Sequence, residues 1–324
     1  MRRVLLALGC LAMIGVPVGA VQAQEAFPSK PIRLVVPYPA GGSTDLMARF
    51  LQEPLTKILG QQVFVDNRPG AAGAIGTREV AGAAPDGHTL VFSNNGPTSI
   101  APSIQKDAGY DSLKSFAPVS LVAIAPLVLA VHASVPADNV ADFIAYAKTQ
   151  GGGLFYSSAG PGSLGHLSTE LLAARAGIKL NHVPYKGQAP ATMALLTGDV
   201  KVFFSTINQT FNDYVQEKKI KILGISSSEP SPVVPNVRPI GETVKGYAVD
   251  VWFGILAPAK TPQPAIDKLN AALVTVLAQH EIKAKFAAIG HEAKSSTPQR
   301  FTSIIAAEVP EWAKIIAENN IKPE

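Results

Sequence analysis

The clearest chemical signal in the sequence is a glycine-rich turn over residues 38–45, which reads Tyr38-Pro39-Ala40-Gly41-Gly42-Ser43-Thr44-Asp45. An apolar run precedes this turn, and a helical pattern begins at Leu46. Adjacent glycines let a ligand approach the backbone closely. The N–H groups and the dipole of a helix N-terminus favour an anion. We expect Ser43 or Thr44 to cap the helix and Asp45 to lie in its first turn. An ordinary strand–helix turn is the alternative.

A second turn of the same kind follows a strand-like run at residues 154–157 and opens a helix. Its residues 160–165 match the dinucleotide fingerprint G-x-G-x-x-G. That fingerprint also needs an acidic residue about 20 positions further on to bind the ribose. Residues 178–187 contain no acidic residue. We therefore expect this turn to bind an anion through backbone N–H groups, without a nicotinamide cofactor.

Ser163 raises the alternative of a secreted serine hydrolase. It occupies the serine position of the nucleophile elbow G-x-S-x-G, but Pro161 replaces the first glycine. His166 follows too closely on the helix to act as the distant base, and the only late histidines are His280 and His291. No histidine has a partner four residues away, and no cysteine lies near one. We expect no catalytic residue, no metal and no cofactor, and we expect His166 either to contact ligand or to cap its helix.

Further polar residues end predicted strands, where ligands bind in open α/β sheets. Together they would form a pocket rich in backbone donors, hydroxyls and amides, with Phe204 as an additional apolar wall and Lys186 as the single placeable cation. The predicted ligand-binding residues are Tyr38, Ala40, Gly41, Gly42, Ser43, Thr44, Asp45, Asn94, Ser158, Ala159, Gly160, Ser163, His166, Tyr185 and Ser205.

The elements that must position these residues alternate between strands and helices. We expect strands at residues 32–37, 63–65, 89–93, 119–123, 127–131, 154–157, 180–184, 202–205, 222–226 and 253–258. We expect helices at 44–59, 73–82, 98–104, 141–149, 165–176, 189–197, 209–217, 264–279, 280–288 and 298–319. Such alternation favours an α/β fold with parallel sheets flanked by helices.

Two long apolar segments suggest that the chain passes twice between two lobes. Residues 117–131, divided by Pro126, form one crossing, and residues 250–258 form the other. Lobe I would then be discontinuous, comprising 27–124 and 254–324, and lobe II would comprise 125–253. A pair of crossings is a natural hinge. The alternative is a single sheet with two long central strands.

The N-terminal residues indicate export. Arg2 and Arg3 precede an apolar stretch, and Val21-Gln22-Ala23 resembles a cleavage site, so residues 1–23 are predicted to be a signal peptide. Cys10, the single cysteine, lies inside it; a lipoprotein cysteine is the alternative. We therefore expect a periplasmic protein without disulfides. The formal net charge of +4 comes from scattered basic residues, which makes nucleic acid a poor candidate partner. We expect a monomer.

The chain resembles the Bug family of periplasmic receptors, the substrate-binding components of tripartite tricarboxylate transporters. The resemblance lies in five segments, in family order: residues 38–45, Asp66-Asn67-Arg68-Pro69-Gly70-Ala71-Ala72-Gly73, Pro85-Asp86-Gly87-His88-Thr89-Leu90, Val183-Pro184-Tyr185-Lys186-Gly187 and Trp252-Phe253-Gly254-Ile255-Leu256-Ala257-Pro258. It implies a two-lobed type II periplasmic-binding-protein fold that closes on a carboxylate and delivers it to a membrane permease. A sensor that presents its liganded form to a signalling protein is the alternative.

The resemblance also implies how the ligand is held. One carboxylate would meet residues 40–45 through backbone groups and water, and the distal end would meet residues 158–163 and the loop at Tyr185. Pro161 and Leu164 make the second turn stiffer and more apolar than in relatives. Ser205 stands where many relatives have an aspartate, which disfavours an amino-acid ligand. A dicarboxylate, tricarboxylate or aromatic carboxylate is expected.

Overall fold

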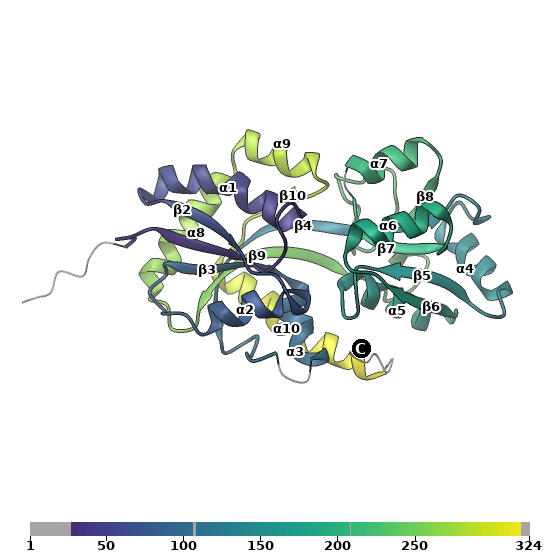
Figure 1. The fold of residues 1–324 in the computed structure, drawn as a ribbon, viewed down its shortest axis with the longest axis horizontal. Coiled ribbons are helices and arrows are strands. Elements are labelled where there is room, and N and C mark those ends of the chain that lie inside the picture. Colours follow the sequence, from purple (N-terminus) through teal and green to yellow (C-terminus); the bar gives the residue numbers. More distant parts are fainter. Residues whose placement is uncertain (1–26, 106–107, 208, 319–324) are drawn as a thin grey trace, which may run out of the picture.

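The computed structural model describes residues 27–105, 108–207 and 209–318, arranged as two lobes joined by extended strands (Figure 1). The predicted signal peptide and Cys10 lie outside the described residues. The mixed α/β architecture and the two lobes confirm the fold expected from the sequence.

The first lobe is built on a sheet with the strand order β2-β1-β3-β9-β4. Both faces of this sheet are covered: Leu34 and Val36 of β1 belong to one apolar cluster, and Val35 between them belongs to another. Strands buried on both faces read as continuous apolar runs, as residues 32–36 do. The strands are β1 (Ile32–Val36), β2 (Val63–Asn67), β3 (Thr89–Asn94), β4 (Phe116–His132), β9 (Asp250–Pro258) and β10 (Glu292–Ala293), a short strand beside β4 that the sequence did not predict.

The second lobe is built on a sheet with the order β4-β7-β5-β6, and β8 pairs with β4 on its other side. The strand β4 is therefore common to both sheets. The remaining strands are β5 (Leu154–Ser158), β6 (Leu180–Pro184), β7 (Val202–Thr206) and β8 (Ile220–Ile225).

The prediction of two separate strands around Pro126 is wrong, because β4 runs without a break from Phe116 to His132. Proline ends a strand when its missing N–H breaks the ladder. Here Pro126 lies where β4 changes partners, from β9 in the first lobe to β7 and β8 in the second. The neighbouring Leu127 supplies the bond across the junction by donating its N–H to the Ser226 Oγ at 2.9 Å.

Strand direction places the two glycine-rich turns between the lobes. The parallel strands β1 and β3 run antiparallel to β9, which runs antiparallel to β4, so β1 and β3 run in the direction of β4 toward the second lobe. The parallel strands β5, β6 and β7 run antiparallel to β4, toward the first lobe. The carboxyl ends of the parallel strands of both sheets therefore face each other across the junction.

Helices cover both sheets (Figure 1). In the first lobe, α1, α8 and α9 lie on one face and α2, α3 and α10 on the other. The C-terminal helix packs Phe301 and Ile305 against the first sheet. The helices are α1 (Ser43–Leu59), α2 (Ala74–Ala81), α3 (Ala101–Ile104), α4 (Val140–Thr149), α5 (Leu164–Ala176), α6 (Gln188–Thr197), α7 (Gln209–Gln216), α8 (Gln263–Leu277), α9 (His280–Ala288) and α10 (Pro298–Glu318), with short turns η1 (Ala71–Gly73), η2 (Gly96–Ile100, a π turn) and η3 (Ile240–Glu242).

Candidate ligand-binding site

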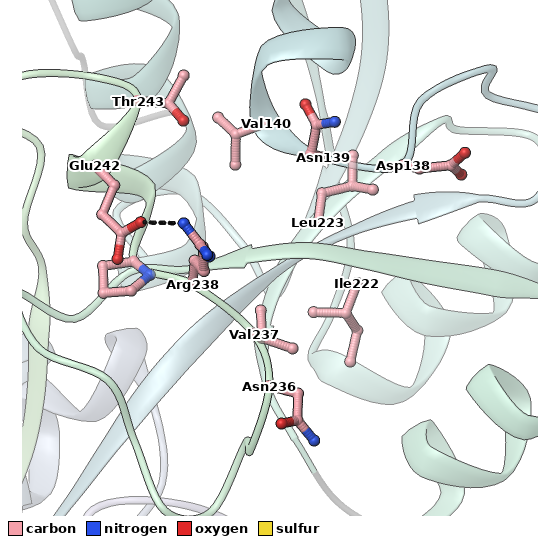
Figure 2. A pocket seen from close by; sticks show the side chains of 11 residues that line it. Asp138, Asn139, Val140, Ile222, Leu223, Asn236, Val237, Arg238, Glu242 and Thr243 are labelled. Atoms are coloured by element: carbon pink, nitrogen blue, oxygen red, sulfur yellow. Dashed lines mark hydrogen bonds and ion pairs between the residues drawn. The ribbon is translucent and has the colours of Figure 1, made fainter.

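A cavity of about 540 Å³ lies on the second lobe (Figure 2), and neither glycine-rich turn contributes a residue to its lining. Its charged groups are paired: Arg238 lies 3.4 Å from Glu242, and Asp138 lies 2.9 Å from Lys221. It is lined by Asp138, Asn139, Val140, Ile222, Leu223, Asn236, Val237, Arg238, Pro239, Glu242 and Thr243. None of these is a predicted site residue, so the candidate site is built from the strand ends instead.

The first turn is organised by Asp45, whose side chain is 2% exposed. Its Oδ2 accepts the Gly41 N–H at 2.9 Å and the Arg49 Nε–H at 2.9 Å. Its Oδ1 accepts a hydrogen bond from Asn67 Nδ2 at 3.0 Å. Burial opposes ionisation of Asp45, but these three donors outweigh it and hold the pKa of the carboxyl below its usual range. The Asp45 carboxylate therefore holds the first turn in place by hydrogen bonds to Gly41, Arg49 and Asn67.

The expectation that Ser43 or Thr44 caps α1 is wrong. The cap residue is Gly42, and no side chain bonds at that position. The reason is the tight turn: Gly41 has φ +87°, and the turn's closing bond is made by Asp45 from inside the helix. The N–H groups of Ser43, Thr44 and Asp45 bond to no described residue. They form a row of free donors at the positive end of a helix, as anion binding requires.

Tyr38 and Asn94 meet at the edge of this turn. The Tyr38 hydroxyl donates to Asn94 Oδ1 at 2.8 Å, and the Gly96 N–H donates to the same oxygen at 3.0 Å. Burial raises the pKa of Tyr38, which keeps the hydroxyl protonated as a donor. The oxygen of Asn94 is thus held by two donors, while its amide N–H groups bond to no described residue. The structure brings these two predicted residues into contact, and their role in binding ligand stays a prediction. The sequence did not single out Asn67, whose Nδ2 also bonds the Tyr38 carbonyl at 3.1 Å.

The second turn satisfies most of its own donors. The Gly160 N–H donates to Ser158 Oγ at 3.1 Å, and the Gly162 N–H donates to His166 Nδ1 at 3.0 Å. Ser163 caps α5 by accepting the His166 N–H at 3.4 Å. At the helix start, the N–H groups of Leu164 and Gly165 bond to no described residue. The His166 side chain thus bonds to the turn just before the helix start, as a capping role would require, and its contact with ligand stays a prediction.

Behind the second turn lies a stack of aromatic rings that the sequence did not predict. The rings of His166 and His182 are parallel at 4.0 Å, and Tyr156 stacks on His182 at 5.0 Å. The Nε2 atom of His182 lies 2.7 Å from Ser158 Oγ. Burial, together with the neighbouring His182, lowers the pKa of His166 to about 4. His166 is therefore neutral at pH 7, and its Nδ1 accepts a hydrogen bond from the Gly162 N–H.

The remaining predicted residues line the same strand ends. The Tyr185 N–H donates to the Ser158 carbonyl at 3.1 Å, and the Gly187 N–H donates to the Ala159 carbonyl at 3.2 Å, which joins the β6 loop to the second turn. Ser205 is buried and donates to the Thr206 carbonyl at 3.2 Å. Ala40, Gly41, Gly42 and Ala159 are exposed.

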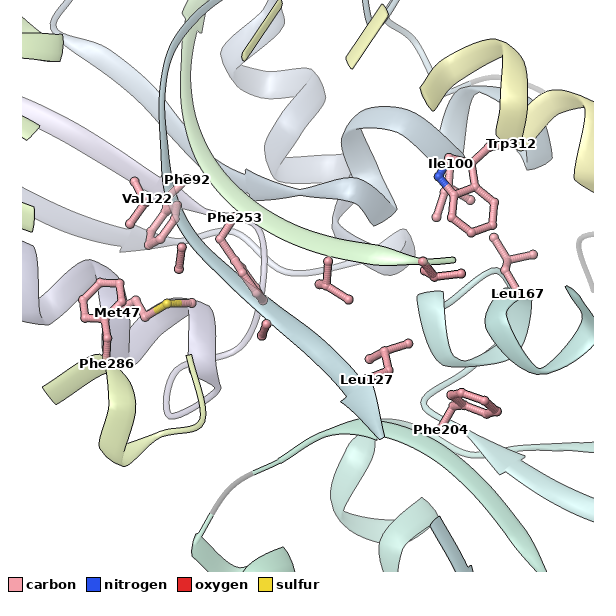
Figure 3. Close-up of a cluster of buried hydrophobic side chains, with 14 of the residues drawn as sticks. Met47, Phe92, Ile100, Val122, Leu127, Leu167, Phe204, Phe253, Phe286 and Trp312 are labelled. Atoms are coloured by element: carbon pink, nitrogen blue, oxygen red, sulfur yellow. The ribbon is translucent and has the colours of Figure 1, made fainter. Parts of the chain in front are cut away.

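The second turn also touches the first lobe. A Cβ on Gly162 would lie 3.3 Å from Ile104 Cδ1, a tight contact, so the backbone of the second turn lies close to α3. Figure 3 shows Leu167 of α5 facing Ile100 and Trp312 of the first lobe, and these three belong to one apolar cluster. The two lobes are in contact at this edge, and this contact holds the second turn close to α3.

Among the described residues, no group of three or more histidine, cysteine, aspartate or glutamate side chains is arranged to hold a metal ion. Within the same ranges, every helix is too short or too polar to cross a bilayer.

Comparison with known proteins links this geometry to a family. Residues 47–321 match the family model described as the tripartite tricarboxylate transporter family receptor. The chain is 34% identical to Protein BugT of Bordetella pertussis over 321 residues, covering 96% of this chain and 98% of that protein. It superposes on R. palustris Rpa4515 with adipate at TM-score 0.82, with 32% identity over 92% of this chain and all of that one. It superposes on MatC from Rhodopseudomonas palustris with bound malate at TM-score 0.77, with 31% identity over 90% of this chain and 100% of that one.

Proposed function

The chain belongs to the tripartite tricarboxylate transporter receptor family, whose members are periplasmic solute-binding proteins and not enzymes, and we propose that it captures a linear dicarboxylate between its two lobes. The observation that carries the proposal is the row of free N–H groups at Ser43, Thr44 and Asp45, at a helix start that faces the second lobe. One carboxylate of the ligand accepts hydrogen bonds from these N–H groups, in the way that helix N-termini bind anions.

The second turn supplies the other end of the proposed site. The free N–H groups of Leu164 and Gly165 begin α5, which faces the first lobe. Two helix starts directed at each other suit a ligand with an anionic group at each end. The ligands in the printed names of two similar structures, adipate and malate, are both dicarboxylates. The neutral His166 and the buried Ser205 offer no charge to a ligand ammonium, which disfavours an amino acid.

The direct test is calorimetric titration of the protein with adipate and malate, with hexanoate as the one-carboxylate control and 1,6-hexanediol as the neutral control. We expect a dicarboxylate to bind and the diol to give no heat. A ligand that binds only the native state at 100 times its Kd adds about 2.7 kcal/mol of stability, so a thermal shift must accompany the heat. Heat and thermal shift absent for every carboxylate, including after unfolding and refolding to release bound cargo, would overturn the proposal.

A matched pair of glycine variants locates the site. Gly41 and Gly60 both have positive φ, +87° and +72°, and neither has any atom within 4 Å of an added Cβ. Alanine strains both positions equally, by about 1 kcal/mol. Gly41 lies in the first turn and Gly60 at the far end of the same helix. We expect Gly41→Ala to weaken dicarboxylate binding at least about tenfold, since it costs a close approach, and Gly60→Ala to leave it unchanged. Equal affinities of the two variants for the dicarboxylate would show that the ligand does not bind at the first turn.

We propose further that the loaded receptor delivers its ligand to a membrane permease of the tripartite tricarboxylate transporter type. Uptake of labelled ligand, measured in cells with and without the permease, tests this step. Uptake that is lost with the permease supports transport. Uptake that persists, together with a transcriptional response that needs this chain, would instead identify a sensor.

A further inference from the structure

The chain passes between the lobes at two places that lie side by side, in β4 at Pro126 and at Val249–Asp250, where β9 begins. Ser226 holds both on the second-lobe side. Its Oγ accepts the Leu127 N–H at 2.9 Å and donates to the Val249 carbonyl at 2.7 Å. We call this contact the second-lobe clasp, and every group in it is uncharged.

Asn95 holds the same crossing on the first-lobe side. Its Nδ2 donates to the Asp250 carbonyl at 3.2 Å, and its Oδ1 accepts the Trp252 N–H at 2.9 Å. Asn95 is fully buried and directly follows Asn94, whose amide belongs to the proposed ligand site. The first-lobe clasp, formed by Asn95, Trp252, Ser99 and Glu308, therefore connects the ligand loop with the strand that joins the lobes.

Glu308 of α10 completes the first-lobe clasp and makes it ionisable. Its Oε1 accepts a hydrogen bond from Asn95 Nδ2 at 2.7 Å. Its Oε2 accepts hydrogen bonds from Ser99 Oγ at 2.9 Å and Trp252 Nε1 at 2.7 Å. Ser99 belongs to the π turn η2, a distortion that is frequent at functional sites. All three partners are donors, so the arrangement fits a carboxylate.

Burial of the Glu308 carboxylate opposes its charge more strongly than the three donors favour it. Burial raises the pKa of Glu308 to about 7, against the effect of the three donors, and the Asp250 charge on β9 adds to the rise. The elements packed on α10 bring few other titratable groups: η2 and α3 contain none, β4 contains only His132 at its far end, and Tyr110 donates its hydroxyl to the Pro97 carbonyl. On α10 itself, Glu311 and Lys314 are exposed.

We propose that Glu308 is a positioning residue whose protonation releases the first-lobe clasp, so that acidification loosens the crossing at Asp250–Trp252 and weakens ligand binding. Protonation removes the negative charge that strengthens these bonds, and it places an O–H donor on one of the two oxygens. A proton on Oε1 competes with the bond from Asn95. A proton on Oε2 leaves Ser99 free to rotate and accept, but it competes with the bond from the Trp252 indole. Either way, one of the bonds in the first-lobe clasp is weakened, while the second-lobe clasp is unchanged.

The indole N–H of Trp252 reports this event without any ligand. The chain has two tryptophans, Trp252 and Trp312, and Trp312→Phe assigns their two indole nitrogen–proton NMR signals. We expect the Trp252 signal of the full protein to titrate with a midpoint near pH 7. We expect it to be flat in Glu308→Gln and to titrate normally in Glu311→Gln, the exposed neighbour on the same helix. A Trp252 signal that does not move between pH 5.5 and 8.5, or that moves equally in Glu308→Gln, would overturn the proposal.

Ser99→Ala keeps the test decisive if Glu308→Gln does not fold. Removing a donor to the carboxylate favours protonation, so the Trp252 midpoint must rise. A midpoint that stays unchanged would show that the carboxylate is not what titrates.

The binding half of the inference rests on the proposed function. We expect the Kd for a dicarboxylate to be at least about threefold weaker at pH 6 than at pH 8 in the wild type and in Glu311→Gln, a small but measurable coupling. In Glu308→Gln this pH dependence should vanish. The same pH dependence in Glu308→Gln would refute the coupling. If no dicarboxylate binds at either pH, the proposed function fails, and the ligand-free Trp252 titration still decides whether the clasp responds to protons.

Discussion

The two glycine-rich turns share one sequence pattern but distribute their hydrogen bonds in opposite ways. The first turn is closed by a carboxylate, Asp45, and leaves the N–H groups of Ser43 and Thr44 free. The second turn is closed by neutral groups, and Ser158 and His166 accept its glycine N–H groups. The same pattern therefore yields a donor-rich turn in one lobe and a largely self-satisfied turn in the other.

The difference suggests separate roles for the two lobes. A rigid turn with free donors binds an anion without rearranging, which favours affinity. A turn that already bonds to itself contributes shape and two donors at its helix start. For the proposed dicarboxylate, we infer that the first turn binds one carboxylate firmly and that the second turn selects ligands by their length. The predictions below test whether the two turns are as differently built as their bonds indicate.

Removing the Asp45 carboxylate should have the largest effect. Asp45→Ala leaves the Arg49 guanidinium, the Gly41 N–H and the Asn67 amide without their acceptor, and we expect a loss of about 3 kcal/mol in the free energy of unfolding. Urea unfolding measures it. Glu53→Gln is the control, because the Glu53–Lys57 pair lies on the same helix but is exposed to solvent, so its unfolding midpoint should not move. Equal midpoints for both variants would mean that Asp45 does not organise the turn.

Mild acid should act on the second turn. Because the pKa of His166 falls from 6.5 to about 4 on folding, the unfolded chain binds more protons in this window. Stability is therefore lost as the pH falls below 6.5, by about 2 kcal/mol at pH 5 for this residue alone. Urea unfolding at pH 7 and pH 5 should show a smaller difference in His166→Asn than in the wild type.

His280→Asn, on the exposed start of α9, serves as the control for that comparison and should keep the wild-type pH dependence. His291 carries a pKa lowered to about 4 by burial, and Glu308 acts in the opposite direction, so only the difference between variants isolates His166. An identical acid loss in His166→Asn would show that the stacked rings do not resist protonation.

A methyl group should be tolerated less well in the second turn than in the first. A Cβ on Gly165 would lie 2.4 Å from the Phe204 carbonyl oxygen, where backbone blocks any relief. We expect Gly165→Ala to cost about 2 kcal/mol by overpacking. Gly41→Ala meets no atom within 4 Å and should cost only the strain of its positive φ, about 1 kcal/mol. Thermal unfolding of the two variants ranks them, and the reverse order would show that the first turn is the more tightly packed.

Much of the fold could be predicted because its signals are local. The alternation of apolar runs with helical patterns predicted the α/β sheets flanked by helices, and two long apolar segments predicted the two lobes. Both turns were found from their glycines. Continuity of β4 through Pro126 could not be predicted, because it depends on where the strand changes partners. The lobe boundaries and the ligand-binding set remain predictions.

The parts of the site that sequence reasoning missed are set by distant contacts. His182 stacks on His166 from a separate strand, and nothing in the residues around it indicates that pairing. Glu308 reaches Asn95 across more than 200 positions, and its exposed neighbours on α10 make it look like one more surface acid. Asn67 stood inside a motif that resembled the family, so the family pattern was the one signal that pointed to it.

The smallest expected effect separates the caps of the two helices. Ser163 caps α5 through a 3.4 Å bond from the His166 N–H, whereas Ser43 lies inside α1 and its hydroxyl caps nothing. Ser163→Ala should therefore cost about 0.5–1 kcal/mol, the low end for a cap because the bond is long. Ser43→Ala should stay within a few tenths of the wild type, since alanine favours helix. Urea midpoints measured side by side resolve this difference. A cost for Ser43→Ala as large as that for Ser163→Ala would mean that the first turn also relies on its serine, and the contrast between a donor-rich and a self-satisfied turn would fail.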